Sequence, residues 1–63
     1  MNDRDVKAIR FLAQKNDFVT SDALAEYLNV SPRTVMRLIK NMNEMSQPDQ
    51  LIHSEKGRGY RID

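Results

Sequence analysis

Apolar residues recur at helical spacing along most of this 63-residue chain and alternate with polar residues only near its C-terminus. The clearest pattern runs from Leu24 to Leu38, with apolar side chains at positions 24, 25, 28, 30, 35 and 38. A polar break interrupts it. Asn29 tolerates the left-handed conformation that ends a helix, whereas Ser31 and Pro32 are typical of a helix start. This stretch therefore predicts a helix-turn-helix motif.

Caps and hydrophobic pairs predict where the helices of this motif begin. Val30 lies just before the cap at Ser31, and Val35 lies five residues further on, which is the spacing of a hydrophobic staple. Thr20 is expected to cap the preceding helix in the same way. The helix after the break is expected to run from Pro32 to about Met45 and to bury Val35, Leu38, Ile39, Met42 and Met45.

The N-terminal stretch predicts one further helix, capped by Asn2 and ending at Asn16 and Asp17. Phe11 lies off the apolar stripe of this helix, so it either covers the edge of a sheet or faces a partner. The extended residues 18–20 then predict a short edge strand before the next cap. The apolar stripe is expected to comprise Val6, Ile9, Leu12 and Ala13, with Arg4, Lys7, Arg10 and Gln14 mostly in solvent.

The C-terminal stretch predicts a polar loop at 46–50 and two short strands at 51–55 and 60–62, joined by the glycine-containing turn 56–59. Ile52, Tyr60 and Ile62 are expected to close one end of the core. We therefore expect a single domain over residues 1–63. Its predicted class is mainly α with a small β wing, a winged helix-turn-helix with a three-helix core plus a two-stranded hairpin.

Composition excludes several classes of site. The chain has no cysteine and one histidine, which excludes disulfides and zinc sites built from several such ligands, and favours a reducing cytoplasm. No apolar run exceeds three residues, so neither a membrane span nor a signal peptide is expected. Because the sequence offers no nucleophile beside a base and no paired carboxylates in a pocket, we expect neither an enzyme nor a bound cofactor.

The net charge of +1 hides an uneven distribution. Residues 1–30 carry four basic and five acidic side chains, whereas residues 31–63 carry six basic and four acidic ones. Between positions 31 and 43 the chain has three basic residues and no acidic residue. A local positive charge of this kind is where a nucleic-acid contact is expected.

The predicted helix after the break would turn a polar face away from its buried stripe. Arginine pairs with guanine, asparagine pairs with adenine, and Met36 could touch a thymine methyl group in the major groove. Ser31 and Thr34, at the helix start, are placed for phosphate oxygens. The alternative is that these are simply exposed side chains of a solvated helix. The face would present Arg33, Met36, Arg37 and Lys40, with Thr34 and Asn41 at its edges.

A second basic cluster, comprising Lys56, Arg58 and Arg61, lies in and beside the hairpin turn. Gly57 and Gly59 would let the backbone approach a phosphate or the wall of a groove. Alternatively, the glycines serve the turn alone and the charges keep an edge strand soluble. The residues predicted to contact DNA are Thr20, Ser31, Arg33, Thr34, Met36, Arg37, Lys40, Asn41, Lys56, Gly57 and Arg58.

Two segments carry a family resemblance. Residues 19–35, Val-Thr-x-x-x-Leu-Ala-x-x-Leu-x-Val-Ser-x-Arg-Thr-Val, and residues 52–62, Ile-x-Ser-x-x-Gly-x-Gly-Tyr-x-Ile, resemble a bacterial winged helix-turn-helix domain. The ending Gly57-x-Gly59-Tyr60 is similar to the N-terminal domains of sugar-operon transcription regulators that carry phosphotransferase-system regulatory domains. Biotin-repressor and DeoR-type repressor domains are also similar. Asn29 departs from the family, which usually has glycine at this turn.

The resemblance implies sequence-specific binding of double-stranded DNA for transcription regulation, with the helix at about 32–45 in the major groove and the wing (55–61) on the backbone or minor groove. It further implies an N-terminal fragment of a longer cytoplasmic regulator that forms a homodimer and meets phosphotransferase-system components through its other domains. Two alternatives stay open. A protein–protein interaction module would more often show a large apolar patch on the helix face, and RNA binding would favour a stacking aromatic surface.

Overall fold

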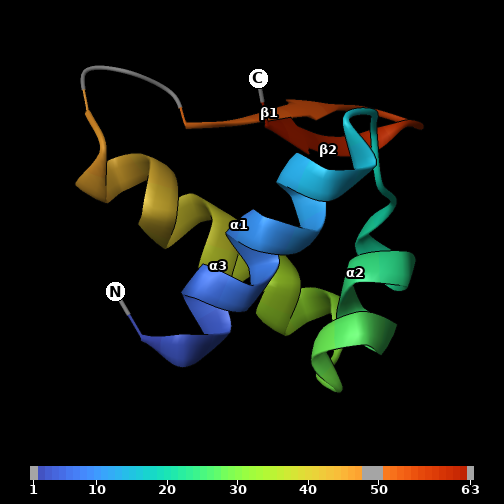
Figure 1. The fold of residues 1–63 in the computed structure, drawn as a ribbon, viewed down its shortest axis with the longest axis horizontal. Coiled ribbons are helices and arrows are strands. Elements are labelled where there is room, and N and C mark those ends of the chain that lie inside the picture. Colours follow the sequence, from blue (N-terminus) through green and yellow to red (C-terminus); the bar gives the residue numbers. More distant parts are fainter. Residues whose placement is uncertain (1, 48–50, 63) are drawn as a thin grey trace.

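Three helices are followed by a two-stranded antiparallel hairpin in the computed structural model of the chain, which describes residues 2–47 and 51–62. The helices are α1 (Asp3–Lys15), α2 (Ser21–Leu28) and α3 (Pro32–Met45), and the strands are β1 (Ile52–Glu55) and β2 (Gly59–Ile62). The hairpin lies across one end of the helical layer, as Figure 1 shows. This arrangement confirms the predicted winged helix-turn-helix fold. Residues 48–50 of the predicted polar loop lie outside the described residues.

Each helix begins at the capping residue that the sequence predicts. The Asn2 side chain accepts a hydrogen bond from the Asp5 amide at 2.9 Å, and the Asp5 carboxylate accepts one from the Asn2 amide in return. Thr20 Oγ1 accepts from the Ala23 amide at 3.1 Å, which starts α2. Ser31 caps α3 in the same way, with Pro32 in the first turn. Losing such a cap costs about 1 kcal/mol of stability.

The ends of α1 and α2 each use an asparagine in the left-handed conformation. Asn16 follows α1 with φ at 52°, and Asn29 follows α2 with φ at 59°. The prediction for Asn29 is thereby confirmed. Among residues other than glycine, asparagine adopts this conformation most readily, because its short polar side chain can bond locally. Asn29 therefore permits the sharp turn into α3.

One core joins all three helices to the hairpin. The four residues that α3 was predicted to bury at 35, 38, 39 and 42 are buried, and Ile52 closes the core from β1. Tyr60 and Ile62 are half-buried against the same cluster, as expected. The buried hydrophobic residues are Ala8, Leu12, Val19, Leu24, Ala25, Leu28, Val35, Leu38, Ile39, Met42 and Ile52.

Two predictions about buried residues are wrong. Met45 has 63% of its surface exposed, because it lies at the margin of the α3 stripe in the last turn of the helix. In α1 the buried face is centred on Ala8 and Leu12, and both Val6 and Ala13 are exposed. Val6 is two residues from Ala8, which places it about 160° from Ala8 around the helix. A small residue at the centre of the face lets α1 approach its neighbours closely.

Phe11 packs against α2, a contact that the sequence did not predict. Its ring stacks on the ring of Tyr27 in α2, with the ring centroids 4.1 Å apart and the planes 20° from parallel. The Lys7 ammonium nitrogen lies 5.5 Å from the centroid of the Tyr27 ring, and that of Lys15 lies 5.2 Å from the centroid of the Phe11 ring. Phe11 therefore joins α1 to α2.

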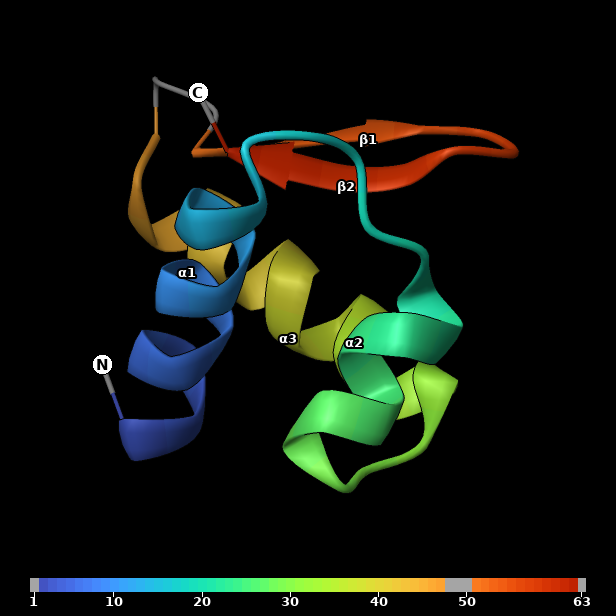
Figure 2. The ribbon, with the colours of Figure 1, turned by 45° about the vertical axis from the view of Figure 1, so that its right-hand side comes forward.

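The predicted edge strand at 18–20 is reduced to a single pairing. Val19 and Tyr60 exchange two backbone hydrogen bonds, both of 2.8 Å. Figure 2 shows the segment between α1 and α2 passing close beside β2. Gly59 makes this approach possible, since a Cβ atom there would clash with the carbonyl oxygen of Val19. The space at Gly59 is therefore used by the protein's own backbone, which corrects the expectation that it admits a phosphate or groove wall.

Candidate nucleic-acid interface

The outer face of α3 carries the basic side chains that the sequence predicts for it. Arg33, Arg37 and Lys40 are exposed, as are Met36 and Asn41 at its two sides. The first acidic residue on this face is Glu44, in the last turn. The amino-terminal three turns of α3 thus form a cationic surface, which we call the α3 face.

Hydroxyl groups at the helix starts are already engaged in capping. Ser31 Oγ lies 3.0 Å from Thr34 Oγ1 and also accepts from the Thr34 amide at 3.2 Å. Thr20 accepts from the Ala23 amide. A hydroxyl oxygen has two lone pairs and one proton, so capping leaves part of its hydrogen-bonding capacity for a further group.

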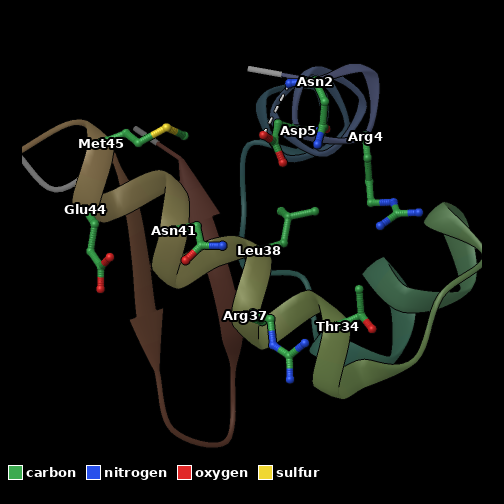
Figure 3. A pocket seen from close by; sticks show the side chains of 9 residues that line it. All are labelled: Asn2, Arg4, Asp5, Thr34, Arg37, Leu38, Asn41, Glu44 and Met45. Atoms are coloured by element: carbon green, nitrogen blue, oxygen red, sulfur yellow. Dashed lines mark hydrogen bonds between the residues drawn. The ribbon is translucent and has the colours of Figure 1, made fainter.

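A groove runs between α1 and one side of α3, and we call it the α1–α3 groove (Figure 3). Its volume is about 490 Å³. Figure 3 shows Arg4 reaching from α1 toward the start of α3, with Leu38 between the two helices. Arg4 is exposed, as expected, but its place on this groove was not predicted. The lining residues are Asn2, Arg4, Asp5, Thr34, Arg37, Leu38, Asn41, Glu44 and Met45.

A second groove lies on the opposite side of α3, and we call it the wing groove. It has a volume of about 440 Å³ and is bounded by the start of α2, by Met36 and by the hairpin. Met36 and Asn41 lie about 140° apart around the axis of α3, so the two grooves flank the α3 face on either side. Met36 has 59% of its surface exposed. The lining residues are Thr20, Ser21, Met36, Ser54, Glu55, Lys56, Gly57, Arg58, Gly59 and Tyr60.

The hairpin is tied to α3 by one side chain that the sequence analysis missed. The Asn43 amide nitrogen donates to the Ile52 carbonyl at 3.0 Å, and the Ile52 amide donates to the Asn43 side-chain oxygen at 2.8 Å. This paired contact imitates the bonding of a neighbouring strand. The available signal was an asparagine in the interior of a predicted helix, where this residue type is neither favoured nor on the apolar stripe.

The turn of the hairpin places its charged residues in different surroundings. Lys56 and Gly57 are exposed, and a Cβ atom at Gly57 would meet nothing within 4 Å. Its φ of 84° shows that this glycine serves the turn. Arg58 is held from two sides. Its guanidinium carbon lies 4.4 Å from the centroid of the Phe18 ring, and its Nη1 atom lies 3.6 Å from Oε1 of Glu55.

Among residues 2–47 and 51–62, no group of three or more His, Cys, Asp or Glu side chains is placed to hold a metal ion. None of the helices in this part of the chain is long and apolar enough to cross a membrane.

Comparison with known proteins adds one match. A protein-family model described as "HTH domain" matches residues 4–61. The matched range begins in α1 and ends in β2, so it includes the hairpin as well as the two helices of the motif. No curated protein and no solved structure matches the chain significantly.

Proposed function

The chain belongs to this HTH domain family, whose members are DNA-binding domains of transcription regulators, and we propose that it reads the sequence of double-stranded DNA with α3. The observation that carries the proposal is the α3 face. Arg33 and Arg37 lie one helical turn apart, an arrangement that destabilises an isolated helix by roughly 0.2–0.5 kcal/mol. A polyanion bound on this face would attract both guanidinium groups and so offset their mutual repulsion.

The two grooves support a specific orientation of the duplex. A major groove is about 12 Å wide and admits one α-helix, with a phosphate backbone on each side of it. With α3 in the major groove, one backbone would follow the wing groove past Thr20, Lys56 and Arg58. The other backbone would follow the α1–α3 groove past Arg4 and Thr34. Arg4 thus joins the proposed contacts.

The proposed base contacts come from three side chains on and beside the α3 face. Arg37 would pair with a guanine, Asn41 with an adenine, and Met36 would touch a thymine methyl group. Arg33, Lys40 and Ser31 would bind phosphates and fix the helix in the groove. Gly57 would allow the turn of the hairpin to lie against the backbone or the minor groove.

We further propose that the domain serves a longer, cytoplasmic regulator of the sugar-operon class, in which a homodimer binds two half-sites. The ending Gly57-Arg58-Gly59-Tyr60 supports this class by its similarity to such regulators. Two domains on half-sites about one helical turn apart would supply the affinity that one small domain lacks. The phosphotransferase-system components would act through other domains of that protein.

The test is a selection of binding sites from random duplex DNA, followed by a salt series on the selected duplex. Contacts to about three to five phosphates predict a log–log slope of about −3 to −5. The double variant Arg33→Ala/Arg37→Ala should lose binding. A matched control, Lys7→Ala/Lys15→Ala, removes the same charge from the α1–α2 side and should bind nearly as the parent does. No enriched sequence, together with a slope near zero, would instead favour a protein–protein interaction module.

A further inference from the structure

The ring of Phe18 lies beneath the arginines of the hairpin. Arg58 is 4.4 Å from its centroid and Arg61 is 5.9 Å from it, each measured at the guanidinium carbon. Phe18 belongs to the segment between α1 and α2, far from the hairpin in sequence. Its ring is half-buried. The position of an arginine in the wing groove thus depends on a residue outside the hairpin.

The backbone around Phe18 is fixed relative to β2. The Phe18 amide donates to the Asp17 carboxylate at 2.7 Å, and the next residue, Val19, forms the two-bond pairing with Tyr60. Gly59, which lies beside Arg58, leaves room for this close approach. The ring therefore has a defined place under the turn of the hairpin.

Stacking on a ring leaves the donors of a guanidinium available. The N–H groups of arginine lie in the guanidinium plane, so a ring over one face does not compete with acceptors at the edge. At present Glu55 lies at 3.6 Å from one edge nitrogen of Arg58. Both side chains are more than half exposed, 58% for Arg58 and 54% for Glu55, so the ion pair is open to exchange with another anion.

We propose that Phe18 is a positioning residue for DNA binding, which holds Arg58 at the wing groove to receive a backbone phosphate, and that Glu55 competes with this phosphate for the same guanidinium. The inference rests on the proposed DNA-binding function and deepens it. Glu55 lowers affinity for every duplex alike, because phosphates are present in every sequence. The pair Phe18 and Glu55 therefore sets how much of the binding energy comes from contacts that carry no sequence information.

The first test removes the ring of Phe18 and keeps an apolar side chain in its place. Phe18→Leu should weaken binding to the selected duplex by about 3- to 10-fold. Phe18→Tyr, which keeps a ring, should bind this duplex as tightly as the parent does. Phe11→Leu is the matched control, since Phe11 is also half-buried and stacked but lies on the α1–α2 side. It should leave affinity unchanged. Thermal melts of all three variants establish that each is folded at the temperature of the binding assay.

A double-mutant cycle then separates positioning from general structural damage. In an Arg58→Ala background, Phe18→Leu should have no further effect on affinity, because there is no guanidinium left to position. An undiminished loss in that background would overturn the role of Phe18. Unchanged affinity of Phe18→Leu in the parent background, with Arg58→Ala still weakened, would overturn it as well, while the proposed DNA binding would stand.

The second test concerns Glu55 and does not depend on any change at Phe18. Glu55→Gln should strengthen binding to selected and random duplexes alike, by about 2- to 5-fold, and this gain should vanish in an Arg58→Ala background. Glu26→Gln, an exposed acid on α2, is the control for net charge. An equal gain from Glu26→Gln, or a gain that persists without Arg58, would overturn the competition. A parent domain that binds no duplex at all would overturn both proposals.

Discussion

The α3 face and the tip of the hairpin both present exposed arginines, but the two regions hold them in different ways. On α3, Arg33 and Arg37 point outward because of their spacing on one continuous helix, which is capped by Ser31. In the hairpin, Arg58 is held by Phe18 from another segment and by Glu55 from the adjacent strand. A surface built within one helix depends on local sequence, whereas a surface built from several segments depends on the packing between them. Substitutions distant in sequence should therefore disturb the wing first.

The variant with the largest expected effect disrupts the contact between β2 and the segment that joins α1 to α2. Gly59→Ala places a Cβ atom against the Val19 carbonyl at a φ of 109°, which only glycine adopts readily. The free energy of unfolding should fall by about 2–4 kcal/mol in urea denaturation. Gly57→Ala is the control, because it also has positive φ but open space around it. It should cost about 1 kcal/mol, and equal losses at both positions would contradict the contact at Val19.

A second variant detaches the hairpin from α3 without touching either arginine surface. Asn43→Ala removes two hydrogen bonds to Ile52 and should lower the free energy of unfolding by about 1–3 kcal/mol. Hydrogen exchange at the Ile52 amide should accelerate more than exchange within α3. Asn41→Ala, two residues away on the exposed side, should change stability by less than about 0.5 kcal/mol. Similar losses for the two asparagines would remove the anchoring role of Asn43.

A third pair of variants compares the two arginine surfaces through binding. Arg37→Ala should cost about 1–3 kcal/mol on the best duplex and relax the base preference at one or two positions. Arg58→Ala should weaken binding to all duplexes alike, since a phosphate contact carries no sequence information. Dissociation constants for the selected duplex and its single-base variants measure both effects. If Arg37→Ala lowers every affinity by the same factor, α3 does not read bases.

The smallest expected effect concerns the turn that sets α3 against α2. Asn29→Gly should leave the melting temperature unchanged or raise stability by up to about 0.5 kcal/mol, because glycine adopts a φ of 59° without strain. Asn29→Val should be destabilising by about 1 kcal/mol or more, since a branched side chain clashes in this conformation. Thermal melts of the two variants provide the comparison. Equal melting temperatures for Asn29→Val and Asn29→Gly would contradict the left-handed conformation at this position.

The contrast between features built within one helix and features built from several segments also explains which of them could be predicted from the sequence. Caps, the left-handed Asn29 and the buried stripe of α3 from Val35 to Met42 follow from residues within one or two turns of each other, and these predictions are confirmed. The α1 stripe was predicted only in part. Leu12 is buried and Ile9 packs against the core, but Val6 and Ala13 are exposed, and Ala8 was missed because so small a residue contributes little to an apolar pattern. Met45 was placed wrongly, because helical periodicity does not tell where the neighbouring core ends.

The parts of the site that escaped prediction all join distant segments. Asn43 pairs with the start of β1, Arg4 lines a groove with α3, and Phe18 lies under Arg58. Each of these residues looks ordinary in its own stretch of sequence, and only the fold brings it to its partner. The DNA contacts predicted at each position remain predictions, which the variants described above test.

The pairing of Val19 with Tyr60 also has a consequence for the order in which the domain folds. Contacts between α2 and α3 close short loops and can form early, whereas this pairing must close a loop over most of the chain and so carries a larger entropic cost. During synthesis it cannot form until β2 has left the ribosome. The helix-turn-helix would therefore be assembled first, and Arg58 would reach its place over Phe18 only in the final step of folding.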